Sequence, residues 1–307
     1  MKLRIRTKVA LLVFAVGFVC AGTVGVFSFI SARSHMHRIM DVEYKTQVHL
    51  LKKVIDEVLK YVKRDLIFLT RIPPVRGIIR AKDHNGFDPV EKKTYEQWAG
   101  ELGVIFREFA VAEKDYMQVR LIDESGREIA RVDYDGESAR IVPQHQLQDK
   151  SSRYYFKEGM KLSRGEIYIS GIDLNRENGH IQVPLHPTLR YVAPVFNTHG
   201  KVRALLVLNV LAHKMLHISP MKIERGVENL FIVDQEGFYL RNCRDSSKEW
   251  GGPRDLGTGE NLVKDYPDVA TRILSEREGL VWSGAVSYTH LRAHETSLHL
   301  VCRLLLE

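Results

Sequence analysis

Hydrophobic and polar positions follow three different patterns along this chain, and each pattern predicts a different kind of element. Residues 9–32 carry no charged side chain, and a helix of that length, at about 1.5 Å per residue, crosses a hydrocarbon core of about 30 Å. The four Lys and Arg side chains within residues 1–8 have no acid among them, so the positive-inside rule places residues 1–8 in the cytoplasm and the rest of the chain outside it. A cleaved signal peptide is the alternative. Because its apolar region is normally about 7–15 residues, we expect an uncleaved transmembrane helix.

The next segment, residues 33–72, is expected to form a long stalk helix. Residues 34–70 contain neither proline nor glycine, and their apolar residues recur at intervals of three and four, which places them on one helix face. That face either pairs with a second copy of the chain, giving a homodimer, or packs on the sheet of its own domain. Pro73 and Pro74 end this helix. The apolar residues of the face are Val48, Leu51, Ile55, Val58 and Val62.

Farther along the chain, apolar positions alternate with polar ones, which predicts strands joined by tight turns. Residues 117–123 and 128–133 flank an Asp-Glu-Ser-Gly turn, and residues 230–233 and 238–240 flank Asp-Gln-Glu-Gly. Such an Asp accepts backbone N–H groups of the turn, and the Gly is free to adopt positive φ. The repeated pattern predicts two related modules in tandem.

The remaining elements complete an α+β fold with antiparallel sheets. A helix is expected from Pro89 to Phe109, and residues 189–197 and 202–210 form a hairpin around Asn-Thr-His-Gly. The second of these strands is nearly all apolar, as is typical of a strand buried on both faces. We therefore expect one module at residues 73–220 and a second at residues 221–285.

Charge and cysteine content exclude several classes of function. The formal net charge is +7, but four of the positive charges lie in residues 1–8 and the others belong to a surface of mixed sign, so nucleic-acid binding is not expected. Of three cysteines, only Cys243 lies outside the apolar run and the C-terminal segment, so no disulfide framework is expected. The exported region has no nucleophile elbow, no Gly-rich phosphate loop and no paired metal-binding histidines. We expect no catalytic residue, metal or cofactor there.

The candidate chemistry lies in residues 147–173. A guanidinium and two phenols open an amphipathic run, a phenol and a hydroxyl follow on an alternating strand, and a carboxylate comes after that strand. Guanidinium groups bind carboxylates through two parallel hydrogen bonds, and an acid binds an ammonium group. The pattern predicts a site for a small polar organic molecule that carries a carboxylate. The side chains concerned are Arg153, Tyr154, Tyr155, Tyr168, Ser170 and Asp173.

Each of these residues also has a structural interpretation. Arg153 is spaced to pair with Asp149 or Glu158 on its own helix face. Aromatic side chains at such positions commonly pack in a core, which is the alternative for Tyr154 and Phe156. Asp173 is alternatively the start of a turn.

The last residues, 286–307, have no period that continues the strand before them. This segment resembles translated sequencing adapter. In one reading frame the adapter gives Val-Ser-Tyr-Thr-His-Leu-Arg-Ala-His-Glu-Thr and then Leu-Val-Cys-Arg-Leu-Leu-Leu-Glu, and both runs occur here. We therefore expect the natural chain to be interrupted near Ala285, the second module to be truncated, and residues 286–307 to have no function.

The segments 147–156, 168–175 and 184–196 resemble the double-Cache (PAS-like) extracytoplasmic sensor domains of bacterial histidine kinases, diguanylate cyclases and chemoreceptors. The resemblance covers residues 1–285 and implies two PAS-like modules after the anchor and stalk. In the amino-acid-binding members an Arg, an aromatic pair and a later Asp form the site. The ligand-binding residues that the resemblance implies are Arg153, Tyr154, Tyr155, Tyr168, Ser170, Asp173 and Arg190.

The function that the resemblance implies is ligand sensing outside the cytoplasm, in a receptor anchored in the bacterial inner membrane. The expected whole protein is a sensor histidine kinase, whose output domain is missing from this sequence. The alternatives are the input region of a diguanylate cyclase or chemoreceptor, and a membrane-anchored binding protein without signalling output. The sequence itself is not expected to be an enzyme.

Overall fold

The computed structural model describes residues 5–216, 230–275, 278–283, 286–292 and 301–306. It forms two compact units, Met1–Gln47 and Val48–Glu307.

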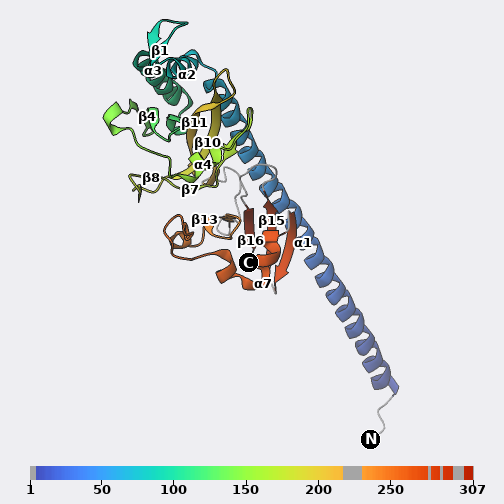
Figure 1. Cartoon of the computed structure of the whole chain (residues 1–307). Coiled ribbons are helices and arrows are strands. Elements are labelled where there is room, and N and C mark those ends of the chain that lie inside the picture. The colour runs from blue at the N-terminus through green and yellow to red at the C-terminus, as the bar shows by residue number, and fades with distance from the viewer. Residues whose placement is uncertain (1–4, 217–229, 276–277, 284–285, 293–300, 307) are drawn as a thin grey trace. The chain divides into compact units, whose positions relative to one another are not determined.

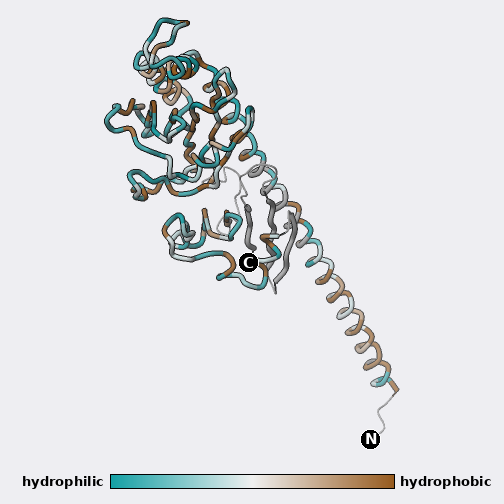
Figure 2. The backbone as a smooth tube through the Cα atoms, in the orientation of Figure 1, coloured by the Kyte–Doolittle hydropathy of each residue, from teal (hydrophilic) through white to brown (hydrophobic). Residues whose placement is uncertain are grey.

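Helix α1 (Ile5–Leu69) begins in the first unit and continues into the second. Within its stretch Ile5–Met36, an 18-residue window has a mean hydropathy of 2.5 and is not buried, and the stretch is long enough to cross a membrane. Figure 2 shows the apolar character of this stretch. The predicted span, residues 9–32, lies within it.

The C-terminal part of α1 packs within the second unit. A stripe of its apolar side chains, spaced by three and four residues, is at most 2% exposed, whereas Val58 from the predicted face is only half-buried. The alternative in which the stalk face packs on its own domain is therefore confirmed for this part, and dimerisation through the stalk stays a prediction. The buried stripe consists of Ile55, Leu59, Val62, Leu66 and Leu69.

Two helices, α2 (Pro73–Asp83) and α3 (Tyr95–Glu113), lie side by side (Figure 1). A Cβ on Gly77 would lie 2.2 Å from the Trp98 ring, so glycine permits their close approach. The helix predicted from Pro89 begins at Tyr95 instead. Thr94 forms a capping box with Gln97 there, which satisfies the free N–H groups of the first turn. The short strands β1 (Phe87–Asp88) and β2 (Lys93–Thr94) precede it.

The first module is built on an antiparallel sheet of order β5-β4-β3-β11-β10-β6, with β7 also pairing with β10. Helix α3 packs on β3, β4 and β5, and α4 packs on β10 and β6. Helix α4 spans Tyr154–Gly159, and the separate hairpin β8 (Arg176–Glu177) and β9 (His180–Ile181) follows β7. The strands are β3 (Tyr116–Asp123), β4 (Glu128–Tyr134), β5 (Ala139–Ile141), β6 (Tyr168–Ile169), β7 (Asp173–Leu174), β10 (Pro187–Phe196) and β11 (Val202–Leu211).

The predicted Asp turns are confirmed. Asp123 Oδ1 accepts the N–H of Ser125 at 2.8 Å, and Gly126 has φ +95°. In the second module Asp234 Oδ1 accepts the N–H of Glu236 at 2.9 Å, and Gly237 has φ +87°. The same backbone solution thus joins β3 to β4 and β12 to β13.

The second module has a five-stranded sheet of order β13-β12-β16-β15-β14. Its helices are α6 (Leu262–Asp265) and α7 (Pro267–Ser275), and α5 (His213–Leu216) follows β11. One-turn 3-10 helices occur at Gln144–Gln146 and Ser246–Lys248. The strands are β12 (Leu230–Val233), β13 (Tyr239–Asn242), β14 (Glu278–Ser283), β15 (Val286–Arg292) and β16 (Val301–Leu306).

Two of these strands, β15 and β16, lie beyond the expected end of the natural chain. Strand β16 pairs with β12, and β15 pairs with β14. Sheet pairing uses backbone groups that every non-proline residue carries, so it does not depend on the side chains. The pairing of β15 and β16 therefore does not test the adapter origin of residues 286–307, which stays a prediction. The predicted module boundaries at residues 220 and 285 lie outside the described residues.

Candidate functional site

The loop that leads into α4 is fixed by a close contact with the first Asp turn. Lys150 N–H donates to Gly126 O at 2.7 Å, and a Cβ on Gly126 would lie 2.5 Å from that of Ser151. At the other end of α4, a Cβ on Gly159 would lie 2.6 Å from Val192 Cγ1. Because both ends are held so closely, Arg153, at the N-cap, has a defined position over the sheet.

Four of the predicted site residues meet at one buried cluster. Tyr154 donates its hydroxyl hydrogen to Asp173 Oδ2 at 2.7 Å. Arg190, only 1% exposed, forms an ion pair with Asp173 and donates to Tyr154 Oη at 3.2 Å. Ser170 Oγ accepts the backbone N–H of Arg190 at 2.9 Å. Helix α4, strand β7 and strand β10 thereby hold a tyrosine, a carboxylate and a guanidinium together.

The environment fixes the charges of this cluster. Burial lowers the pKa of Arg190, but the neighbouring Asp173 carboxylate outweighs that and raises it above the ordinary value. Burial raises the pKa of Tyr154, so its hydroxyl keeps its proton and donates it in the hydrogen bond to Asp173. The acid that the sequence predicts for a ligand ammonium group is thus already compensated by an arginine from β10.

The other predicted aromatic residues support the cluster from the sheet side. Tyr155 is 1% exposed, and its hydroxyl accepts a hydrogen bond from Arg120 Nη1 at 3.1 Å. The guanidinium groups of Arg190 and Arg153 lie over its ring, at 5.5 and 5.8 Å from the centroid. Tyr168 packs against the apolar cluster that contains Tyr155, and burial raises its pKa. The core interpretation was made for Tyr154 and Phe156: Phe156 is buried in this cluster, and Tyr154 is partly buried and packs against it.

A pocket of about 320 Å³ opens beside the buried cluster. Of the predicted residues, Arg153, Tyr154 and Asp173 line it, while Tyr155, Tyr168, Ser170 and Arg190 lie behind or beside these and fix their positions. The lining residues are Arg153, Tyr154, Asp173, Leu174, Arg176, Gly179 and Arg254.

The electrostatics of this pocket favour an anion. Three arginines line it, and its only carboxylate belongs to Asp173, which Arg190 neutralises. The expected alternative partners of Arg153 were Asp149 and Glu158. Asp149 instead accepts the N–H of Ser151, and Glu158 pairs with Lys161 at 2.7 Å. Arg153 lies over the Tyr155 ring, and no ion pair of Arg153 is found among the described residues. The Arg153 guanidinium is thus available to a ligand.

One wall of the pocket comes from the second module. The sequence did not reveal this contribution. The Arg254 guanidinium lies 5.4 Å from the Tyr154 ring centroid. Arg176 donates to Arg254 O at 3.0 Å, and Leu174 N–H donates to Asp255 Oδ1 at 2.8 Å. Burial raises the pKa of Asp255 to about 6. These residues are about eighty positions apart in sequence and share no motif, so only the packing of the two modules brings them together.

A buried charge network that joins β3 and β4 to Glu177 of β8 contacts Tyr155 through Arg120 and was also missed. Arg120 and Arg131 lie 3.5 and 3.2 Å from the Glu177 carboxylate. Burial raises the pKa of Glu177, but these two arginines outweigh it and lower the pKa to about 2. Burial also lowers the pKa of Lys150 to about 8. Charged residues alternating with apolar ones in β3 were the available signal, since Arg120 lies between Val119 and Leu121.

The described residues hold no group of three or more His, Cys, Asp or Glu side chains arranged to bind a metal ion. The polar groups at the pocket are guanidinium, phenol and carboxylate. These groups bind through hydrogen bonds and charge, and they suit a small organic ligand.

Comparison with known proteins relates this chain to bacterial sensor domains. The sequence model of the family "Bacterial histidine kinase, sensor domain" matches residues 56–301. No relative among the curated proteins matches the sequence.

Three solved structures show the same fold. A domain of a sensory box/GGDEF family protein from Vibrio parahaemolyticus is 24% identical, with a TM-score of 0.70 over 85% of this chain and 93% of that one. The ligand-binding domain of the Campylobacter jejuni chemoreceptor Tlp3, in complex with 4-methylisoleucine, is 11% identical, with a TM-score of 0.54 over 84% and 86%. The sensor domain of the Vibrio cholerae histidine kinase DctB is 13% identical, with a TM-score of 0.54 over 86% and 95%.

Proposed function

This chain belongs to the bacterial histidine kinase sensor-domain family, and we propose that it senses a small organic anion through the pocket at Arg153. The observation that carries the proposal is the set of three arginines around a pocket whose one carboxylate is already neutralised. Guanidinium groups bind carboxylates through two parallel hydrogen bonds. A ligand carboxylate placed against Arg153 and Arg254 also gains from the partly desolvated surroundings.

The ligand class follows from Asp173. In a site that binds amino acids, an acid facing the ligand holds the ammonium group. Here Asp173 receives Arg190 and the Tyr154 hydroxyl, so an ammonium group would compete with two existing partners. The proposed ligand is therefore a mono- or dicarboxylate without an amine. Tlp3, a distant relative by fold, has been solved with L-valine bound, so L-valine is the natural comparison.

The location and assembly of the receptor complete the proposal. The apolar stretch Ile5–Met36 anchors the chain in the bacterial inner membrane, and the basic residues before it keep residues 1–8 in the cytoplasm. A reporter that is active only outside the cytoplasm, fused after residue 220, should then be active. Activity of a cytoplasmic reporter at that position would contradict this topology. Homodimerisation through α1 is part of the same proposal.

The whole protein is proposed to be a sensor histidine kinase, with this region as its non-catalytic input. The family match favours a kinase output, and the likeness to a GGDEF-family protein keeps a cyclase output as the alternative. The complete gene sequence distinguishes the two.

The pocket is tested by ligand-induced stabilisation. The full chain in nanodiscs is heated with succinate, propionate or L-valine at constant ionic strength, and the unfolding midpoint is recorded. A ligand that binds only the folded state adds about 2.7 kcal/mol at one hundred times its dissociation constant. We expect succinate or propionate to raise the midpoint more than L-valine does.

The matched variants are Arg153→Ala and Lys157→Ala. Both remove one positive charge from α4, but only Arg153 lines the pocket. Arg153→Ala should abolish the stabilisation, and Lys157→Ala should leave it intact. Equal losses in the two variants, or stabilisation by L-valine alone, would contradict the proposal.

A further inference from the structure

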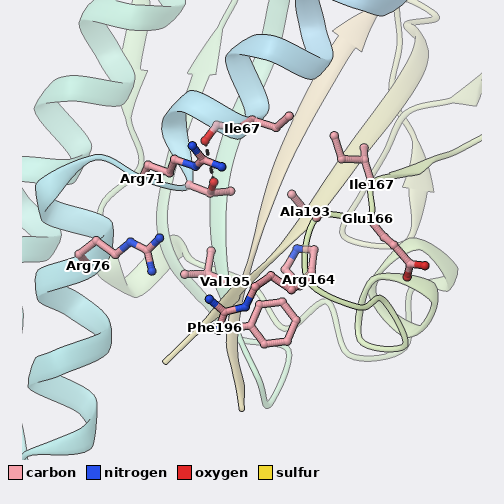
Figure 3. A pocket seen from close by; sticks show the side chains of 12 residues that line it. Ile67, Arg71, Arg76, Arg164, Glu166, Ile167, Ala193, Val195 and Phe196 are labelled. Carbon is pink, nitrogen blue, oxygen red and sulfur yellow. Dashed lines mark hydrogen bonds between the residues drawn. The ribbon is translucent and has the colours of Figure 1, made fainter. Parts of the chain in front are cut away.

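A second basic pocket lies on the first module, at the end of α1, the start of α2 and the end of β10. Its volume is about 180 Å³ (Figure 3), and it shares no lining residue with the pocket at Arg153. Three of its side chains are the arginines Arg71, Arg76 and Arg164. Arg71 and Arg76 lie close together in the sequence, whereas the fold brings Arg164 to them from the segment before β6.

The positive charges of this pocket are not neutralised by the one acid that lines it. Glu166 accepts the N–H of Ser163 at 2.7 Å, and Figure 3 shows its carboxylate pointing away from the guanidinium groups of Arg76 and Arg164. Within the described part of the chain, no ion pair is found for Arg71, Arg76 or Arg164. Three guanidinium groups around one small space repel one another, and a bound anion would relieve that repulsion.

The floor of the pocket is apolar. Val195 and Ala193 are buried in β10, and the exposed Ile67 lies on α1. Arg164 lies over the ring of Phe196, 5.2 Å from its centroid, which holds its guanidinium at the pocket edge. Apolar surface next to guanidinium groups suits a ligand with a charged head and an apolar body.

We propose that this pocket is a second ligand site, which binds a small organic oxyanion with an apolar body. The oxyanion is held by Arg76 and Arg164, whose guanidinium groups point toward each other across Val195 (Figure 3), with Arg71 adding charge above them. The apolar body lies on Val195 and Phe196. The proposal does not depend on the function assigned to the first pocket.

The test uses benzoate and acetate, which share a carboxylate but differ in apolar area. Binding to the full chain in nanodiscs is measured by calorimetric titration at constant ionic strength, in the Arg153→Ala background, which weakens anion binding at the first pocket. Benzoate should bind more tightly than acetate. The double substitution Arg76→Ala/Arg164→Ala should weaken benzoate binding by about 10- to 100-fold, because it removes charge-assisted hydrogen bonds.

Two controls keep the result interpretable. Arg127→Ala removes an exposed arginine outside both pockets and should leave benzoate binding unchanged. Arg76→Lys/Arg164→Lys keeps the charges without the guanidinium geometry, so an intermediate affinity is expected, and the unfolding midpoint without ligand verifies that each variant folds. The inference is overturned if benzoate does not bind, if acetate binds equally well, or if the double alanine variant binds benzoate like its Arg153→Ala parent.

Discussion

The two modules repeat one backbone motif but bury different side chains. In each, a strand, an Asp turn and a second strand form part of an antiparallel sheet. The second module packs an apolar cluster that includes Phe231, Tyr239 and Ile273, and its only buried polar residue among those described is Asn242. The first module buries many, namely Asp88, Gln118, Arg120, Glu128, Arg131, Lys150, Ser170, Asp173, Asn175, Thr188, Arg190 and Asn209.

This difference shows that the strand–turn–strand motif folds without the buried polar side chains found in the first module. The turn geometry is the same around Asp123 and Asp234, so polar side chains in the sheet are not required for the fold. Burying charge costs free energy unless every group is paired. The proposed ligand site would account for a charge network in the first module, whereas the buried residues of the second module are those of an ordinary apolar core.

The largest expected effect comes from Arg190→Ala. It leaves the buried Asp173 carboxylate unpaired, and breaking a buried ion pair costs about 3–5 kcal/mol of unfolding free energy. The double variant Arg190→Met/Asp173→Asn leaves no charge unpaired and should recover most of that loss. Urea denaturation of the three proteins measures both effects. A negligible loss in Arg190→Ala would mean that the network is hydrated and that the comparison between the modules fails.

The matching substitution in the second module is Ile273→Ala. Ile273 is 1% exposed in the apolar cluster, and truncating such a side chain costs about 2–5 kcal/mol through lost burial and the cavity left behind. Succinate affinity of the folded protein should not change, in contrast to Arg190→Ala. A large change in affinity would show that the second module shapes the site through its core.

A smaller, pH-dependent effect is expected at the contact between the modules. Burial raises the pKa of Asp255 to about 6, with Asp173 adding to the shift and Arg254 and Arg176 opposing it. A folded-state pKa above the unfolded value favours the protonated acid. The contribution of Asp255 is therefore fully present below about pH 4 and is lost as the pH rises through about 6.

Asp255→Asn keeps an oxygen that accepts the Leu174 N–H but cannot ionise. The unfolding midpoint of the variant should match the native protein near pH 4 and exceed it at pH 7. Asp245→Asn is the control of opposite sign, because hydrogen bonds from Ser247 lower the pKa of Asp245. A native midpoint that does not fall between pH 4 and 7 relative to Asp255→Asn would show that Asp255 is hydrated.

The strands beside the two Asp turns could be predicted to within about two residues because two independent signals agreed. Alternation placed a strand at 117–123, the Asp turn fixed its end, and β3 spans Tyr116–Asp123. The helix predicted from Pro89 failed at its start because the capping box at Thr94 and the preceding hairpin set the boundary. In both cases a hydrogen-bonding side chain at the end of the element, in the Asp turn or in the capping box, set the boundary.

From the sequence, only those site residues could be predicted that lie within a single segment of the chain. Arg153, Tyr154 and Asp173 were available from residue type and order, and all three line the pocket. The role of Arg190 in neutralising Asp173 depends on the pairing of β10 with β7. Arg254 required the packing of a distant loop, which no pattern in the sequence specifies.

The smallest effect on stability, and the sharpest test of the comparison, is Arg254→Ala. Arg254 is exposed, so the unfolding free energy should change by no more than about 0.5 kcal/mol. If the second module contributes only its own packing and no ligand contact, Arg254→Ala will leave succinate affinity unchanged as well. We expect it to weaken severalfold, because Arg254 supplies one of three positive charges at the pocket.

Lys264→Ala removes another exposed charge of the same module, away from the pocket, and should leave affinity unchanged. Equal affinities in both variants would confine the ligand site to the first module, whereas a loss specific to Arg254→Ala would make the second module part of the receptor site.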